Sequence, residues 1–487
     1  MSSCGNPQST DADELMPRRL KFGRSRVCVR CRENPGNIVI RHAVYCRDCF
    51  SPLVTMKFRK ALQPAINASA GTSKRPRLKA EGNLLMAFSG GLGSSVLLDI
   101  IHSTYFSGQP PVDEDGNPVG GKKHPRNASV WPSASVCYVE VCSAFPGMRD
   151  RTEEVRGAVE QYPSFEFVPL RVEDAFDKSW WEQVGGAPSA FQLSVDLGIG
   201  NLSLASASST PPDLTPVESM RTYLASLPTP TAVSSAIQNL VRMLTLHAAR
   251  SRGASHLLLG TSLTSLSIGL ISSISQGGGY ATREELQEEW TPSGFGSTET
   301  SRPISIVRPL RDVTMKECAA YAWWNDIKIV GRDKSARAIQ GIANLTKDFI
   351  VGLEKDYPST VSTIARTCAK LAPKDAPNGN CILCQRPVQH GIQEWKSRIS
   401  IRSYADAKLA LAAHTHPSSQ CDPPAQPLDP MPSLTPRLCY SCHTTLTSRS
   451  SRGLKTTGHL PAPLPVWSKQ SGQSEMRDAI ADYLLDG

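Results

Sequence analysis

Cysteines at metal-binding spacing are the first chemical feature of this sequence. Eight of its fourteen cysteines stand in four C-x-x-C pairs. Each such turn presents two thiolates to one ion, and two turns complete a tetrahedral Zn²⁺ site. In a reducing compartment this arrangement favours metal ligation over disulfide bonds. The pairs are Cys28 with Cys31, Cys46 with Cys49, Cys381 with Cys384, and Cys439 with Cys442.

The two N-terminal pairs are separated by fourteen residues, and the segments 38–40 and 43–45 between them indicate the arms of a small hairpin. A module with so little apolar core needs a metal to fold. We expect structural Zn²⁺ here, with redox-active or free thiols as the alternative. The two C-terminal pairs are separated by 54 residues, so His390, His416, Cys421 and His443 are alternative ligands for a second site.

A glycine-rich loop spans Ser89–Ser95, after an apolar strand and before a helix. Glycines let backbone N–H groups point at one anion, and the helix N-terminus adds its positive dipole end. No lysine follows, so this is not the common NTPase loop. A tight structural turn is the alternative interpretation. The candidate phosphate ligands are Ser89, Gly90, Gly91, Ser94 and Ser95, and ATP is the candidate nucleotide.

Three single cysteines have different surroundings. Cys137 and Cys318 lie in apolar patterns and are predicted to be buried packing residues. Cys142 ends a predicted strand at the ligand-binding edge, so it is the one lone cysteine with a conceivable catalytic role.

From residue 81 onwards, short apolar strands alternate with amphipathic helices. This alternation predicts a doubly wound α/β fold with a parallel sheet covered by helices on both faces. Such sheets bind ligands beyond the carboxyl ends of their strands. The predicted strands are Leu84–Phe88, Val136–Val141, Phe165–Leu170, His256–Leu259 and Ile304–Leu310, and the helices Ser94–His102, Arg151–Gln161, Ala232–Arg252 and Thr314–Asn325.

Composition divides the chain into five parts. We expect a disordered basic tail (1–24), a zinc module (25–50), a basic helix and linker (51–80), the α/β domain (81–375) and a C-terminal zinc-binding region (376–487). Residues 107–133 and 201–230 are predicted to be flexible insertions, and 415–438 a Pro/Ser-rich loop.

Positive charge is concentrated at the N-terminus. Residues 1–80 contain sixteen Lys and Arg against five Asp and Glu, although the whole chain has a net charge of only +9. Such a segment suits a polyphosphate such as RNA, with a solvated basic tail as the alternative. No apolar signal segment or membrane span is present, so we expect a cytoplasmic protein. The candidate RNA-binding residues are Arg18, Arg19, Lys21, Arg24, Arg26, Arg30 and Arg32.

The loop at 89–95 resembles the S-G-G-x-D-S signature of the PP-loop family, the ATP pyrophosphatases that adenylate their substrates. The acidic position of that signature is Gly93 in this chain. Nucleotide hydrolysis is therefore in doubt. The order of a basic four-cysteine module, a PP-loop domain and a C-terminal cysteine pair is similar to the cytoplasmic tRNA 2-thiolation protein 2 family. The segments 257–262 and 307–317 support this resemblance.

This resemblance implies a heterodimer with a catalytic subunit that thiolates uridine 34 of tRNAs for Lys, Gln and Glu. It also implies a ubiquitin-related modifier as sulfur carrier. The catalytic relatives keep cysteines and carboxylates at positions that match 229–237, 260–265 and 276–279, and this chain has none there. Sulfur transfer needs a reactive thiolate and magnesium needs oxygen ligands, so we expect a non-catalytic subunit. The alternatives are an active adenylating enzyme and a zinc-dependent adaptor unrelated to RNA.

Overall fold

The computed structural model describes both cysteine-rich regions and most of the chain between them. Five of the seven candidate RNA-binding residues (Arg18, Arg19, Lys21, Arg24 and Arg26) lie outside the described residues. Within the described part, no helix is both long and apolar enough to cross a bilayer. The described residues are 27–41, 43–66, 82–107, 130–184, 194–195, 202, 214–286, 288–291, 303–331, 341–371, 379–389, 391, 434–448 and 462–468.

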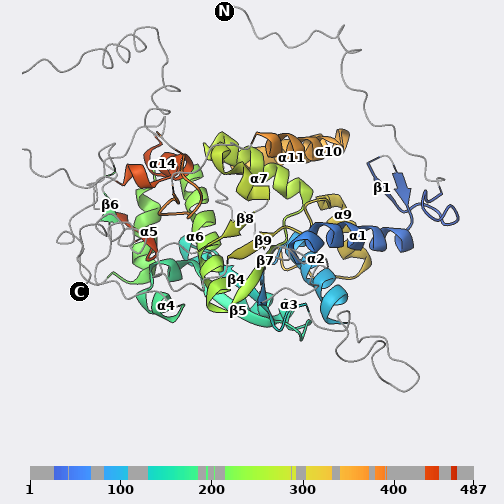
Figure 1. The fold of residues 1–487 in the computed structure, drawn as a ribbon, viewed down its shortest axis with the longest axis horizontal. Coiled ribbons are helices and arrows are strands. Elements are labelled where there is room, and N and C mark those ends of the chain that lie inside the picture. The colour runs from blue at the N-terminus through green and yellow to red at the C-terminus, as the bar shows by residue number, and fades with distance from the viewer. Residues whose placement is uncertain are drawn as a thin grey trace, which may run out of the picture.

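A six-stranded sheet forms the centre of the fold (Figure 1). Five strands run parallel, and the sixth, β8, pairs antiparallel with β9 at one edge. The parallel strands coincide with the predicted ones to within a few residues. In spatial order the strands are β5 (Glu166–Arg171), β4 (Ala134–Glu140), β3 (Asn83–Ala87), β7 (Ala254–Leu259), β9 (Ile304–Val307) and β8 (Glu288–Trp290).

Successive side chains of the central strands point to opposite faces of the sheet. Leu84 and Met86 of β3 belong to one hydrophobic cluster, and Leu85 belongs to another. Helices cover both clusters, which confirms the predicted doubly wound fold. The first cluster includes α2 (Leu92–Ile101), α3 (Thr152–Val159) and α9 (Met315–Trp324), and the second includes α5 (Pro216–Ser226) and α6 (Pro230–Ser251).

Strand order reverses beside β3. The chain continues from β3 to β4 and β5 on one side, whereas β7 and β9 extend the sheet on the other. The loops that leave the carboxyl ends of β3 and β7 therefore meet at the topological switch point. Open α/β sheets usually bind their ligands there.

The N-terminal module consists of a hairpin and one long helix. Strands β1 (Ile38–Ile40) and β2 (Ala43–Tyr45) are antiparallel, and α1 (Arg47–Ile66) follows them. Phe50, at the start of α1, lies in the same cluster as Leu84 of the central sheet. The helix thus crosses the expected boundary between residues 50 and 51 and joins the module to the central core.

The expectation of a flexible insertion at 201–230 is wrong for its second half. Residues 216–226 form helix α5, because Thr215 and Glu218 make a capping box and Met220 and Tyr223 are buried. At the end of the other expected insertion, 107–133, the side chain of Trp131 is fully buried. In both places the Ser- or Pro-rich composition predicted a flexible loop, whereas buried side chains hold the segment against the core.

A third layer of helices lies outside the sheet (Figure 1). It packs around a separate hydrophobic cluster and was not predicted from the sequence. Its helices are α7 (Leu263–Ser275), α10 (Ile342–Asp356) and α11 (Thr360–Lys370), with the short α8 (Thr282–Leu286) beside them.

The described C-terminal residues pack against α6. Trp467 is fully buried in the same cluster as Leu240 and Leu244 of this helix, so this end of the chain shares the core of the central domain. The remaining elements are α4 (Lys178–Gln183), α14 (Tyr440–Thr447) and the antiparallel pair β6 (Ser194–Val195) and β10 (Ala462–Pro463).

Candidate metal centres and the glycine-rich loop

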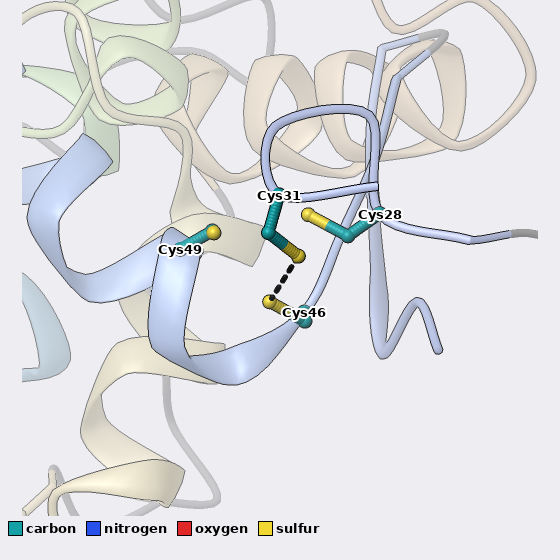
Figure 2. Close-up of side chains that lie close together, drawn as sticks. All are labelled: Cys28, Cys31, Cys46 and Cys49. Carbon is teal, nitrogen blue, oxygen red and sulfur yellow. Dashed lines mark hydrogen bonds between the residues drawn. The ribbon is translucent and has the colours of Figure 1, made fainter. Parts of the chain in front are cut away.

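The structure brings the two N-terminal cysteine pairs into one group (Figure 2). Cys28 and Cys31 precede the hairpin, Cys46 follows it, and Cys49 lies in the first turn of α1. Their four sulfur atoms lie within 4.8 Å of one another, and the Sγ atoms of Cys31 and Cys46 are 3.8 Å apart. Thiolates bound to one zinc ion at about 2.3 Å have this spacing.

The thiols of this group differ in their tendency to ionise. Burial opposes ionisation of Cys28, but backbone hydrogen bonds at Cys31, Cys46 and Arg30 outweigh it and lower its pKa to about 6. Burial, together with hydrogen bonds to the other three thiols, raises the pKa of Cys49 to about 12. Ionisation of Cys28 therefore opposes that of Cys49, and a bound cation would favour the thiolate form of both.

The two C-terminal pairs also form one group, despite their separation in sequence. All four thiols are buried, and the Sγ atoms of Cys384 and Cys439 are 3.6 Å apart. Cys439 caps α14, because its sulfur accepts a hydrogen bond from the backbone N–H of Cys442 at 3.4 Å. The two pairs thus meet although 54 residues separate them in the sequence. His443 is buried but is not part of the group.

Helix α6 holds this C-terminal group against the central domain. The Asn239 side chain donates to the sulfur of Cys442 at 3.8 Å, and the Arg242 guanidinium donates to the Cys384 carbonyl at 2.6 Å. Trp467 donates from its indole nitrogen to the Leu383 carbonyl at 3.0 Å. The site is therefore built into the core rather than placed on an appendage.

Hydrogen bonds within the C-terminal group shift the pKa values of its thiols in opposite directions. Bonds from the other three cysteines hold the pKa of Cys384 well below its ordinary value. Hydrogen bonds with Cys381 and Cys384 raise the pKa of Cys439 and Cys442 well above theirs. In both groups, four sulfur donors at this spacing fit one tetrahedral ion better than a multi-iron cluster, which holds its cysteines further apart.

In the glycine-rich loop, several groups already bond within the protein. The Ser94 hydroxyl donates to the Gly91 carbonyl at 2.9 Å and lies 3.3 Å from the Ser89 hydroxyl. Gly90 has a φ of 71°, a left-handed conformation that favours glycine. The Ser95 hydroxyl is buried and has no hydrogen-bond partner. The loop thus has the strand–loop–helix setting of a phosphate site, with its Ser94 hydroxyl used internally.

Backbone fills the switch point beside this loop. A Cβ atom added to Gly93 would lie 2.1 Å from the carbonyl oxygen of Gly260, in the loop after β7. The backbone N–H of Gly331 donates to the Gly90 carbonyl at 3.0 Å, and the Val330 side chain packs over Gly90. A carboxylate at position 93 therefore has no room unless the backbone moves.

Residues in the segments 229–237, 260–265 and 276–279 perform structural roles. Thr229 and Ser262 cap helices α6 and α7 with their hydroxyl oxygens. Thr264 donates to the Glu354 carboxylate at 2.8 Å and accepts from the backbone N–H of Met315 at 3.0 Å. Gly277 has a left-handed φ of 85° and packs against the ring of Tyr440.

Comparison with known proteins indicates one family. A family model described as cytoplasmic tRNA 2-thiolation protein 2 matches residues 341–444. Protein 2-A of this name from Xenopus laevis is 26% identical and aligns over 96% of both chains. The Bos taurus protein is 27% identical over 96% of this chain and 94% of its own. The chain is thus similar, over nearly its whole length, to proteins named cytoplasmic tRNA 2-thiolation protein 2.

A solved structure with some similarity is the U34-tRNA thiolase NcsA from Methanococcus maripaludis with its 4Fe-4S cluster. It is 14% identical, has a TM-score of 0.45, and covers 77% of this chain and 97% of its own. The residues matched by the family model include α10, α11 and all four C-terminal cysteines. Helices α10 and α11 of the third layer and the buried thiol group thus lie in the segment that the family model matches.

The single cysteines behave as packing residues. Burial raises the pKa of Cys137 and of Cys318 to about 12. Burial also raises the pKa of Cys142, and the nearby carboxylates of Glu140 and Asp150 add to this effect. A raised pKa leaves Cys142 as a neutral thiol, which is a poor nucleophile.

Of the candidate RNA-binding residues, the structure describes two. Arg30 and Arg32 are exposed on the N-terminal module, and the Arg30 guanidinium donates to the Cys49 carbonyl at 3.3 Å. Arg59 and Lys60, which are exposed on α1, were not among the residues predicted from the sequence. The helical pattern of α1 was the signal that could have identified them, because its apolar residues recur at 50, 54, 58, 61 and 62 and leave positions 59 and 60 to solvent.

Proposed function

We propose that this chain is the non-catalytic subunit of a cytoplasmic heterodimer that thiolates the wobble uridine of tRNA. The chain-long similarity to relatives named for tRNA 2-thiolation carries this proposal. The catalytic partner would modify uridine 34 of tRNAs for Lys, Gln and Glu. It would take its sulfur from a thiocarboxylated ubiquitin-related modifier.

The packing at the switch point supports a non-catalytic role. The close approach of Gly93 to Gly260 excludes the carboxylate of an active PP-loop, and Cys142 is held as a neutral thiol. Thr264 occupies a carboxylate position of the catalytic relatives and joins helices instead. A binding role for the loop toward ATP remains part of the proposal, because its backbone still opens directly into α2.

The two cysteine groups support a structural metal role. We assign one Zn²⁺ to each group, because four thiolates at tetrahedral spacing and no open ligand position are typical of structural sites. The N-terminal ion would fix the loop that carries Arg30 and Arg32. The C-terminal ion would fasten the end of the chain to α6.

Reconstitution tests this function directly. We would incubate this chain alone, the catalytic partner alone and the mixture with unmodified tRNA, ATP and the sulfur carrier, and measure 2-thiouridine by mass spectrometry. We expect thiolation only in the mixture, or strongly enhanced there. Thiolation and pyrophosphate release by this chain alone would instead establish an active enzyme. Unchanged thiolation in cells that lack the chain would favour a zinc-dependent adaptor.

A further inference from the structure

Trp323, in the last turn of α9, is the most exposed large apolar residue in the described part of the chain. It is 83% exposed, whereas Trp131 and Trp467 are fully buried in hydrophobic clusters. An indole offers a large rigid face, and covering that face in a complex contributes strongly to affinity. Trp323 is therefore a candidate contact residue for a binding partner.

The last turn of α9 is fixed by its neighbours, so the indole has a defined position. The ring of the next residue, Trp324, packs edge-on against Phe50 of α1, with 5.0 Å between the ring centroids. Tyr321 is buried, and its hydroxyl donates to the Asp99 carboxylate at 3.1 Å. The backbone that carries Trp323 is thus organised before a partner binds, which lowers the entropic cost of binding.

The helix that carries Trp323 is joined to the N-terminal cysteine module, because α9 packs against α1 (Figure 1). The guanidinium of Arg47, in the first turn of α1, donates to the Trp324 carbonyl at 2.5 Å. Lys316 lies two turns before Trp323 on the same face of α9 and donates to the Val39 carbonyl of the hairpin at 3.1 Å. Basic side chains thus connect the indole's helix to the module.

The surface of this module carries an excess of positive charge. Among its described residues, between 27 and 66, six basic side chains are exposed and two acidic ones. The exposed Asp326 and Lys328, just after α9, balance each other. The excess is complementary to a polyphosphate. The exposed charged residues of the module are Arg30, Arg32, Arg41, Arg47, Arg59 and Lys60, with Glu33 and Asp48.

An exposed indole beside a basic surface suits unpaired RNA. Proteins that bind single-stranded nucleic acid combine cationic groups, which contact phosphates, with aromatic rings on which bases stack. Bases inside a double helix stack on one another and leave no free face for an indole. The wobble uridine lies in an unpaired loop, so the tRNA of the proposed function offers bases of the required kind.

We propose that Trp323 stacks against an unpaired base of the tRNA while the basic module holds neighbouring phosphates. This inference rests on the proposed function, because that function supplies tRNA as the polyphosphate. It adds a base contact from the central domain to the phosphate contacts expected of the N-terminal segment. Stacking tolerates any base, so Trp323 recognises that the loop is unpaired and not which sequence it has.

The test compares two substitutions of Trp323 with a matched control. Trp323→Ala removes the ring, and Trp323→Phe keeps an aromatic face. The control Phe349→Ala removes another exposed aromatic side chain, which is 62% exposed on α10. Binding of the full chain to unmodified tRNA and to a fully paired RNA duplex is measured by fluorescence anisotropy from 50 to 300 mM salt. Thermal unfolding of each variant and its co-purification with the catalytic subunit are measured in parallel.

We expect Trp323→Ala to raise the dissociation constant for tRNA about five- to 100-fold, and Trp323→Phe to recover part of the lost affinity. The slope of log K against log salt should stay at the wild-type value, because an indole neutralises no phosphate. Binding to the paired duplex should not change in any variant, since a duplex has no free base face. Phe349→Ala should bind tRNA like wild type.

Three results would overturn the inference in distinguishable ways. Equal tRNA affinity for wild type and Trp323→Ala would remove the stacking contact and leave tRNA binding by the chain intact. Absence of tRNA binding by the wild-type chain would remove the RNA-binding part of the proposed function as well. Loss of the catalytic subunit from Trp323→Ala, with tRNA affinity unchanged, would assign the indole to a protein interface.

Discussion

At the scale of single residues, the close approach of Gly93 to the backbone of Gly260 leaves no room for a side chain at position 93. We predict that Gly93→Ala lowers the midpoint of thermal unfolding by about 4–10 °C. Its Cβ would lie 2.1 Å from a backbone oxygen, and overpacking costs about 1–3 kcal/mol. Gly91→Ala is the control, because its Cβ would meet only the Ser89 hydroxyl at 3.3 Å. Equal unfolding midpoints for the two variants would show that the contact between Gly93 and Gly260 does not restrict the side chain at position 93.

His247 gives the core a dependence on pH. Its Nε2 atom is buried without a hydrogen-bond partner, and its ring packs edge-on against Trp181 and Trp290. Burial, reinforced by the positive charges of Arg250 and Arg242, lowers the pKa of His247 to about 3.

Because the folded-state pKa of His247 lies below its unfolded value of about 6.5, the neutral ring stabilises the fold above that pH. This contribution is lost as the pH falls from 6.5 toward 3. The free energy of unfolding should decrease by about 1.4 kcal/mol for each pH unit in this range. Urea denaturation at several pH values would measure the slope. His247→Phe should remove the contribution of His247 to this slope. An unchanged slope in that variant would show that His247 is not its source.

At the scale of elements, the two cysteine groups differ in how strongly they are coupled to the core. Cys31 and Cys49 are only half-buried beside the hairpin, whereas all four C-terminal thiols lie within the main hydrophobic cluster. We therefore predict that a chromogenic chelator removes zinc in two phases, first from the N-terminal group.

A matched pair of ligand substitutions identifies the phases. Cys49→Ser should abolish the fast phase and leave the main thermal transition within a few degrees of wild type. Cys442→Ser should abolish the slow phase and lower the main transition by at least about 10 °C, because metal binding and folding are coupled. Release of both ions in a single phase would show that the groups do not differ in accessibility.

The sequence was sufficient to predict the helices and strands that have a regular apolar pattern of their own. The strands of the sheet and helices α2, α3, α6 and α9 were predicted to within a few residues, because each has a clear apolar period. Helix α5 was missed although Thr215 and Glu218 form a capping box, since the surrounding Ser and Pro residues suggested a loop. Helices α10 and α11 were also missed, and α10 has a single fully buried residue, Ile350.

At the scale of the whole molecule, features that depend on distant residues could not be predicted. The cysteine spacing predicted both thiol groups, but it did not place the C-terminal group against Asn239 and Arg242 of α6. Likewise, the sequence did not reveal that Gly93 packs against the backbone of Gly260, 167 positions away in the chain. Such contacts are set by the strand order of the sheet, which local pattern does not specify.

The uneven distribution of charge along the chain leads to a final prediction, which concerns the salt dependence of tRNA binding. Residues 1–80 hold sixteen basic against five acidic residues, so this end of the chain should supply most phosphate contacts. Each phosphate contact adds roughly 0.7–0.9 to the slope of log K against log salt. We predict that Arg30→Ala/Arg32→Ala reduces this slope for tRNA by about 1–2, measured by fluorescence anisotropy from 50 to 300 mM salt.

The control Lys347→Ala/Lys355→Ala removes the same charge from α10, whose exposed charges are balanced. It should leave the slope unchanged, because a helix surface without an excess of positive charge does not attract phosphates. Substitution of Arg18, Arg19, Lys21, Arg24 and Arg26 should reduce the slope further, in proportion to the number of phosphates that are no longer neutralised. If all variants bind tRNA with the wild-type slope, the basic end of the chain does not contact RNA, and the recognition of tRNA belongs to the catalytic partner.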